Sequence, residues 1–246
     1  FADAERPECE GAVGSLEHLF WQYPDRAAAQ IPSKLTATQI KGRALDQEAC
    51  EQAQPQQQPS GPVSIRRPNF IREEQGLTPS ERGTALHLAM QYLPLQGCDT
   101  PEGVAEEIAR LVAGGYLTRL QGQAADPQKL SAFFASELGR AMAAAKQCRR
   151  EFKFSVLVPA RDYYPEVGQE EEVLLQGVID AWFSDGDGIT LVDFKSDRVT
   201  AASQTQRAKG YLPQLQAYSR ALEEMTGEPV RRRVLWFFAT GSAVEL

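Results

Sequence analysis

The residues best suited to chemistry lie on two neighbouring strand-like segments in the second half of the chain. Asp193 and Lys195 are two positions apart, so on a strand they share one face while Phe194 points to the other, toward packing. A tight turn can bring Asp180 across from Asp193. Two carboxylates can hold a divalent cation that polarises a phosphodiester, and a nearby ammonium can orient water or stabilise developing charge. The pattern favours metal-dependent phosphodiester hydrolysis.

The sequence around these charges strengthens that interpretation. An Asp-x-Lys pair on a strand is usually an ordinary charge pair at a sheet edge. Here Asp180 follows Gly-Val-Ile and Asp193 follows Leu-Val, so apolar neighbours surround three charged side chains. Burying charge in this way is costly unless a metal or a partner compensates for it.

A predicted helix after Thr78 carries a second set of polar groups. Thr84, His87 and Gln91 form a stripe at helical spacing. His87 is either a hydrogen-bonded histidine at the edge of the core or a metal ligand, and an imidazole suits Mn²⁺ better than Mg²⁺. Glu151, at the start of a predicted strand, is either a solvated charge or a third carboxylate aimed at the site.

A later helix places aromatic and amide groups on one face. Tyr211, Gln214 and Tyr218 are spaced to lie together. Gln214 can hydrogen-bond a phosphate or a base edge, and the tyrosines can stack on an unpaired base. The alternative is that the aromatic side chains simply pack the helix against the sheet.

The expected elements follow the order of an α/β domain with a central mixed sheet flanked by helices. Thr78 caps a helix that has Pro at its first position and a capping-box Glu81, and this helix is expected to end near Leu93. The turn at 184–188 predicts an antiparallel hairpin. The other expected elements are a helix-friendly segment at 33–50, a Gln/Pro-rich linker at 51–62, helices near 101–113 and 126–146, strands at 151–158, 172–183 and 189–194, a helix at 204–225 and a strand at 232–239.

Bulk properties narrow the class. The chain has 246 residues, a net charge of −7 and no apolar run long enough for a membrane helix, so we expect a cytoplasmic protein that does not hold DNA tightly by itself. Four scattered cysteines without a C-x-x-C pair predict that no iron–sulfur cluster is bound. The chain begins with Phe and has no phosphate-binding G-x-x-x-x-G-K-[ST] loop. We therefore expect a fragment without a nucleotide-driven motor.

Taken in order, five segments resemble the nuclease domain of AddA, a relative of RecB in the PD-(D/E)XK nuclease family. The resemblance extends from about residue 33 onward. Two positions differ from the family pattern: Lys153 stands where relatives often carry Pro, and Ile179 stands where the pattern in the family's name has Pro, although Ile is common there in this branch. The segments are Gly83–Gln91, Glu151–Phe154, Gln176–Asp180, Asp193–Lys195 and Tyr211–Tyr218.

The resemblance implies a restriction-endonuclease-like PD-(D/E)XK core with specific residue roles. The implied metal ligands are His87, Asp180, Asp193 and the Phe194 carbonyl, holding Mg²⁺ or, as a substitute, Mn²⁺. Lys195 would serve the attacking water, and Glu151 occupies the position of an active-site glutamate. Gln214 and Tyr218 match a Gln-x-x-x-Tyr motif near the DNA, to which Tyr211 and Gln91 add further expected DNA contacts.

The resemblance also implies an organisation and partners. Residues 1–77 would form an N-terminal helical extension with its linker, and residues 78–246 the nuclease core, with a helical layer at 78–149 and sheet and helix at 150–246. An ATP-driven helicase motor in the parent protein would deliver single-stranded DNA for end resection in double-strand break repair, beside an AddB-like partner subunit. The alternatives are an inactive nuclease fold kept as a DNA-binding scaffold, and a stand-alone exonuclease of the Cas4-like branch, which depends on an iron–sulfur cluster.

Overall fold

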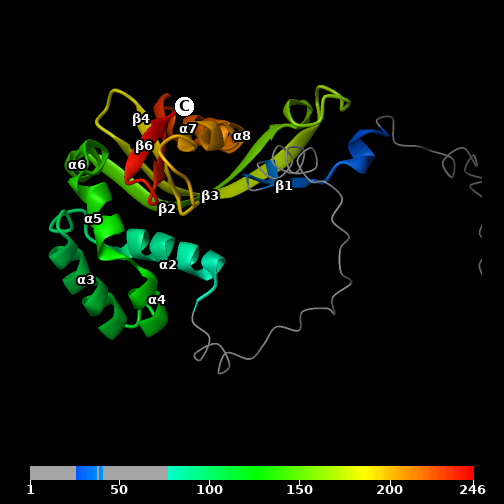
Figure 1. The fold of residues 1–246 in the computed structure, drawn as a ribbon. Coiled ribbons are helices and arrows are strands. Elements are labelled where there is room, and N and C mark those ends of the chain that lie inside the picture. The colour runs from blue at the N-terminus through cyan, green and yellow to red at the C-terminus, as the bar shows by residue number, and fades with distance from the viewer. Residues whose placement is uncertain (1–25, 38, 41–76) are drawn as a thin grey trace, which may run out of the picture. The chain divides into compact units, whose positions relative to one another are not determined.

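The computed structural model describes residues 26–37, 39–40 and 77–246 (Figure 1). These divide into two compact units. The larger unit comprises the described residues of 34–156 together with 174–246, and it contains every predicted site residue. The smaller unit comprises 26–33 and 157–173. The predicted linker at 51–62, Cys9 and Cys50 lie outside the described residues.

A mixed sheet forms the centre of the larger unit. The strands are β1 (Lys34–Thr36), β2 (Gln147–Pro159), β3 (Glu172–Ser184), β4 (Ile189–Lys195), β5 (Val230–Phe237) and β6 (Ser242–Glu245). Among the described residues the order is β1-β3-β4-β5-β6, and β2 also pairs with β3. The β3–β4 pair is antiparallel, as the turn at 184–188 predicts, whereas β4 and β5 run parallel. The predicted α/β class with a mixed sheet is confirmed.

One face of this sheet carries a layer of helices (Figure 1): α2 (Pro79–Tyr92), α3 (Pro101–Ala113), α4 (Arg119–Ala124), α5 (Pro127–Ala135) and α6 (Glu137–Ala144). Thr78 caps α2 through the predicted capping box. The core between helices and sheet is aromatic: the Phe133 ring meets Phe194 edge-on at 5.1 Å between centroids and Trp236 at 5.3 Å. Phe194 therefore packs on the helical side, as strand alternation predicts.

Two further helices, α7 (Gln204–Lys209) and α8 (Leu212–Thr226), lie on the other side of the sheet in Figure 1. Tyr218 of α8 packs edge-on against Phe154 of β2 at 5.7 Å. Asp193 and Lys195 point to this side of the sheet, because they alternate with Phe194 along β4. Along β4, therefore, Phe194 packs into the core on one face, and the charged side chains of Asp193 and Lys195 lie on the other.

Several expected boundaries were wrong. Lys34–Thr36 form a strand paired in parallel with β3, not a helix; partners far along the chain override local composition. The helix expected at 126–146 is split, because Ser136 is extended and caps α6 by accepting from the Gly139 N–H. The helix expected at 204–225 is also split, since Pro213 at the start of α8 cannot donate a backbone hydrogen bond. Helix α4 and strand β6 were not predicted.

The smaller unit consists of short elements and a hairpin end. It contains the 3₁₀ turns η2 (Ala28–Gln30) and η4 (Ala160–Asp162). The Ala160 N–H donates to the Glu171 carbonyl at 2.8 Å, which closes the hairpin between β2 and β3, and Tyr164 and Val167 are buried. Within the described residues of the whole chain, every helix is too short or too polar to cross a membrane.

Arg150 of β2 fastens the end of α2 to the sheet. The last carbonyls of a helix have no partner within the helix. The Arg150 guanidinium donates to the carbonyls of Met90 at 2.7 Å and Leu93 at 2.5 Å. The hydrogen bonds hold α2 at a fixed position on β2.

Replacing this guanidinium should destabilise the protein. For Arg150→Met we expect a fall of about 1.5–3 kcal/mol in the free energy of unfolding, because two carbonyls lose a charged donor. Urea denaturation measures the change. The exposed neighbour Arg149 gives the matched control, and Arg149→Met should stay within about 0.5 kcal/mol of the wild type. Equal losses in the two variants would contradict the anchoring role.

Candidate active site

Asp180 lies on β3 between the residues that pair with β1 and those that pair with β4. Strand β1 pairs with β3 up to Gln176, and the β3–β4 register begins at Ala181 opposite Val192. Residues 177–180 therefore pair with neither β1 nor β4. The Asp180 carboxylate occupies this gap, where its Oδ2 accepts a hydrogen bond from the Phe194 N–H at 2.7 Å. Continuing the register by one step places Asp180 opposite Asp193, as the hairpin predicts.

Asp193 and Lys195 form a buried ion pair on the same face of β4. Their residues are 2% and 9% exposed, and the Lys195 Nζ contacts the Asp193 Oδ2. The ammonium also lies 4.2 Å from the ring centre of Tyr211, an attractive placement for a cation. Burial raises the pKa of Asp193 to about 6; the charge of Lys195 opposes this rise and that of Asp180 adds to it. Burial outweighs the ion pair.

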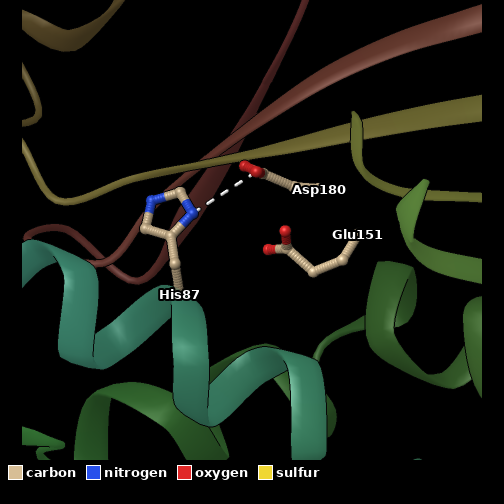
Figure 2. A group of neighbouring side chains, drawn as sticks. All are labelled: His87, Glu151 and Asp180. Atoms are coloured by element: carbon tan, nitrogen blue, oxygen red, sulfur yellow. Dashed lines mark ion pairs between the residues drawn. The ribbon is translucent and has the colours of Figure 1, made fainter. Parts of the chain in front are cut away.

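His87 reaches the carboxylates from α2. Its Nδ1 lies 3.4 Å from the Asp180 Oδ1, and Figure 2 shows the ring turned toward that carboxylate. Burial by itself lowers the pKa of His87, but the hydrogen bond and the charge of Asp180, with the charge of Asp193, raise it above its ordinary value. The imidazole is thus held in an acidic environment, with its ring edge toward Phe194 at 6.4 Å between centroids.

Glu151 completes the cluster through an unusual backbone conformation. Its φ of 50° lies in the left-handed region, where only it among the described non-glycine residues is found. Neighbouring residues on a regular strand face opposite sides, yet Arg150 bonds to α2 and Glu151 also comes close to His87 of α2. The left-handed turn lets both side chains face the helix. Such strain collects at functional sites.

The resulting cluster has the donor set of a divalent-cation site. One ligand atom from each of His87, Glu151 and Asp180 lies within 4.8 Å of the others, and Figure 2 shows the three side chains converging. Carboxylate oxygens suit Mg²⁺ or Mn²⁺, and the imidazole favours Mn²⁺. The cluster contains two of the predicted ligands, His87 and Asp180, together with Glu151, which was expected among the catalytic residues. Asp193, also a predicted ligand, pairs with Lys195.

The cluster opens into a cleft of about 430 Å³. Gln91, one of the predicted DNA contacts, lines it together with His87 and Glu151. Burial raises the pKa of Glu151, and the Asp180 charge adds to this effect. The full lining is Ser80, Gly83, Thr84, His87, Leu88, Gln91, Glu151 and Ser196.

The other three predicted DNA contacts are buried. Tyr211, Gln214 and Tyr218 are 1%, 6% and 4% exposed, and the Gln214 Nε2 donates to the Tyr218 hydroxyl at 2.7 Å. Burial raises the pKa of Tyr218, and the charge of Asp193 raises it further. These side chains back the carboxylates from the α8 side. Their burial agrees with the alternative in which the aromatic side chains pack the helix against the sheet.

Sequence reasoning missed two supports of the site. Asp197 accepts hydrogen bonds from the Tyr211 hydroxyl at 2.5 Å and from Arg207 Nε at 2.8 Å, and so holds the ring that faces Lys195. Gly177 has no room for a side chain, since an added Cβ would lie 2.7 Å from the Phe154 ring. Gly177 lies two residues before Ile179, so its place in the sequence could have revealed the first of these constraints. No local pattern identifies Asp197.

Comparison with known proteins agrees with this geometry. A family model described as the PD-(D/E)XK nuclease superfamily matches residues 64–244. The chain belongs to the PD-(D/E)XK nuclease superfamily.

Individual relatives share one name, which describes a component of an ATP-dependent helicase/nuclease. The protein of Desulforamulus reducens is 36% identical over 99% of this chain and 20% of its own length. That of Desulforudis audaxviator is 38% identical over 95% of this chain and 19% of its own length. That of Ruminiclostridium cellulolyticum is 34% identical over 93% of this chain and 18% of its own length. The chain spans about a fifth of the length of these relatives.

Glu151 offers a test of stored strain. Glu151→Gln removes a charge that repels Asp180 but keeps a long side chain at φ 50°, whereas Asn also removes the charge and tolerates the left-handed region. In the absence of metal, we expect Glu151→Asn to have a free energy of unfolding about 1 kcal/mol above that of Glu151→Gln. Urea denaturation of both variants measures this difference. Equal stabilities would show that the position carries no strain.

Proposed function

We propose that this chain is the nuclease domain of a helicase–nuclease and that it hydrolyses phosphodiester bonds in DNA with Mg²⁺ or Mn²⁺. The observation that carries the proposal is the cluster of His87, Glu151 and Asp180 at the cleft, close enough to the buried Asp193–Lys195 ion pair for the charges of that pair to act on His87. The family match and the name shared by the relatives support the same activity. Its role would be exonucleolytic end resection in double-strand break repair.

The proposed roles follow from what each side chain contacts. His87, Glu151 and Asp180 would hold the cation, with Asp193 and the Phe194 carbonyl as the further ligands implied by the family resemblance. A bound divalent cation supplies Lewis-acid polarisation of the phosphate and lowers the pKa of a coordinated water. Lys195, fixed between Asp193 and the Tyr211 ring, would orient the attacking water and stabilise negative charge on the phosphate.

DNA contact would fall to the residues that the cleft exposes. Gln91 lines the cleft and can hydrogen-bond a phosphate or a base. Contacts from Tyr211, Gln214 and Tyr218 remain a prediction; because these side chains are buried, they would act by holding the carboxylates and Lys195 in place unless DNA entry exposes them.

The rest of the proposal concerns a larger parent protein. The relatives' name describes an ATP-dependent helicase/nuclease, so ATP would be used by a motor outside this chain, which would feed single-stranded DNA to the nuclease. A motor that holds the strand raises its effective concentration at the site. This delivery explains how a chain with a net charge of −7 can act on DNA. The parent would work in the cytoplasm with an AddB-like partner.

The activity is tested with labelled linear single-stranded DNA in Mg²⁺, Mn²⁺, Ca²⁺ or EDTA. We expect cleavage with Mg²⁺ or Mn²⁺ alone. Asp193→Ala should lose about 100-fold in rate because it removes a proposed metal ligand, and Lys195→Ala should lose a similar factor because it removes the cation that would stabilise charge on the phosphate. Asp187→Ala, in the exposed turn between β3 and β4, is the matched control and should keep full activity. If the wild type neither cleaves DNA nor binds Mn²⁺, the alternative of an inactive scaffold would replace the proposed nuclease function.

Metal affinity should depend on pH in a defined direction. Ligands must lose their protons to bind a cation, and the pKa of Asp193 is about 6 while those of His87 and Glu151 are also raised. Mn²⁺ should therefore bind more weakly as the pH falls through 6, by roughly tenfold per pH unit for each proton displaced. Calorimetry on both sides of pH 6 measures this. Asp193→Asn should show a shallower dependence, and an affinity independent of pH would refute the ligand assignment.

A further inference from the structure

A second hollow adjoins the active-site cleft within the larger unit. It has a volume of about 820 Å³ and shares Gly83 and Ser196 with the cleft, so the two hollows are neighbours. Ser196 directly follows the catalytic-strand residue Lys195. We call this hollow the side groove; the residues that line it include Arg82, Asp126, Lys129, Ser196, Arg198 and Phe238.

The side groove carries more positive than negative side chains, although the chain as a whole is acidic. Its lining includes Arg82, Lys129 and Arg198 against one acid, Asp126, while the chain as a whole carries −7. Asp126 has a structural role, because it caps α5 by accepting from the Gln128 N–H at 3.0 Å, and its other oxygen lies 3.6 Å from Lys129. Charge of this sign beside a phosphodiester cleft matches the backbone of a nucleic acid.

The floor of the side groove is tied to the catalytic strand. Phe238 is buried, its N–H donates to the Lys195 carbonyl at 3.0 Å, and its ring stacks on Phe194 at 5.7 Å. A strand lying in the groove is therefore held in a fixed position relative to Asp193 and Lys195. Apolar floor and basic rim together form the kind of channel that follows a single strand.

We propose that the side groove holds the single-stranded DNA arm on one side of the scissile phosphate, with Arg82 and Arg198 contacting its phosphates. The inference rests on the proposed nuclease function and specifies where its substrate lies. About 820 Å³ is within the range of ligand pockets, roughly 300–1,000 Å³. That space suits a few nucleotides of one strand, whereas a duplex would have to bring two backbones into it.

The test compares charge changes inside and outside the groove on the intact chain. Arg82→Gln and Arg198→Gln remove groove cations, and Asp126→Asn removes the groove acid while keeping a good helix cap. Arg231→Gln makes the same charge change at the opposite end of β5 from Phe238. Anisotropy of a labelled oligothymidylate in Ca²⁺, over a range of salt concentrations, measures binding, and cleavage rates in Mg²⁺ give KM and kcat.

We expect Arg198→Gln and Arg82→Gln each to weaken binding several-fold and to reduce the slope of log affinity against log salt by about 0.7, the value for one lost phosphate contact on a single strand. KM should rise, whereas kcat should stay within about twofold of the wild-type value, because the groove binds the substrate away from the reacting atoms. Asp126→Asn should bind more tightly than the wild type, and Arg231→Gln should match it. Duplex DNA of the same length should compete poorly.

The results that would contradict the side groove differ from those that would contradict the proposed nuclease function. A wild type that cleaves DNA, with Arg82→Gln and Arg198→Gln indistinguishable from Arg231→Gln, overturns the groove and leaves the nuclease intact. A wild type that neither cleaves nor binds metal overturns the proposed function itself. Equal competition by duplex and single strands refutes single-strand specificity. Thermal melting of each variant excludes unfolding as the cause of weaker binding. Arg82 and Arg198 are exposed, and the hydrogen bond at risk is that from the Arg82 Nε to the Leu77 carbonyl at 3.1 Å, so the changes in melting temperature should be small.

Discussion

The structure depends on keeping two carboxylates, Asp180 and Asp193, close together away from bulk water. Like charges in a region of low dielectric repel strongly, and each must be compensated. Asp180 receives the Phe194 N–H and faces His87, whereas Asp193 has the ammonium of Lys195. The compensation is incomplete, because the pKa of Asp193 still rises to about 6. A divalent cation bound beside these carboxylates would neutralise the remaining negative charge.

Departures from regular secondary structure make this arrangement possible. Because residues 177–180 of β3 pair with neither β1 nor β4, the Asp180 side chain can accept a hydrogen bond from the backbone of β4. The left-handed φ of Glu151 turns two consecutive side chains toward α2. Arg150 then fixes α2, and with it His87, against β2. Regular strands would have put these groups on opposite faces or left them in ladder hydrogen bonds.

Charge is distributed unevenly over the larger unit. An acidic cluster lies in the cleft, and the adjoining side groove carries three cations against one acid. In the proposed function the acidic cluster would bind a cation but repel a bare phosphate backbone, so attraction for DNA would come from the cation and from neighbouring surfaces. In the proposed function a motor would supply the strand, and a domain supplied in this way needs only local positive charge, which is compatible with a net charge of −7.

The sequence by itself determined what local rules control. The capping box at Thr78, the hairpin between β3 and β4, and the placement of Asp193 and Lys195 opposite Phe194 follow from short-range periodicity and turn chemistry. Tertiary structure decided which groups meet: Glu151 joins His87 and Asp180, Asp197 supports Tyr211, and Lys34–Thr36 become a strand. These contacts join residues from separate elements, and the Glu151 contact also needs a strained φ. Periodicity along one segment carries no information about either.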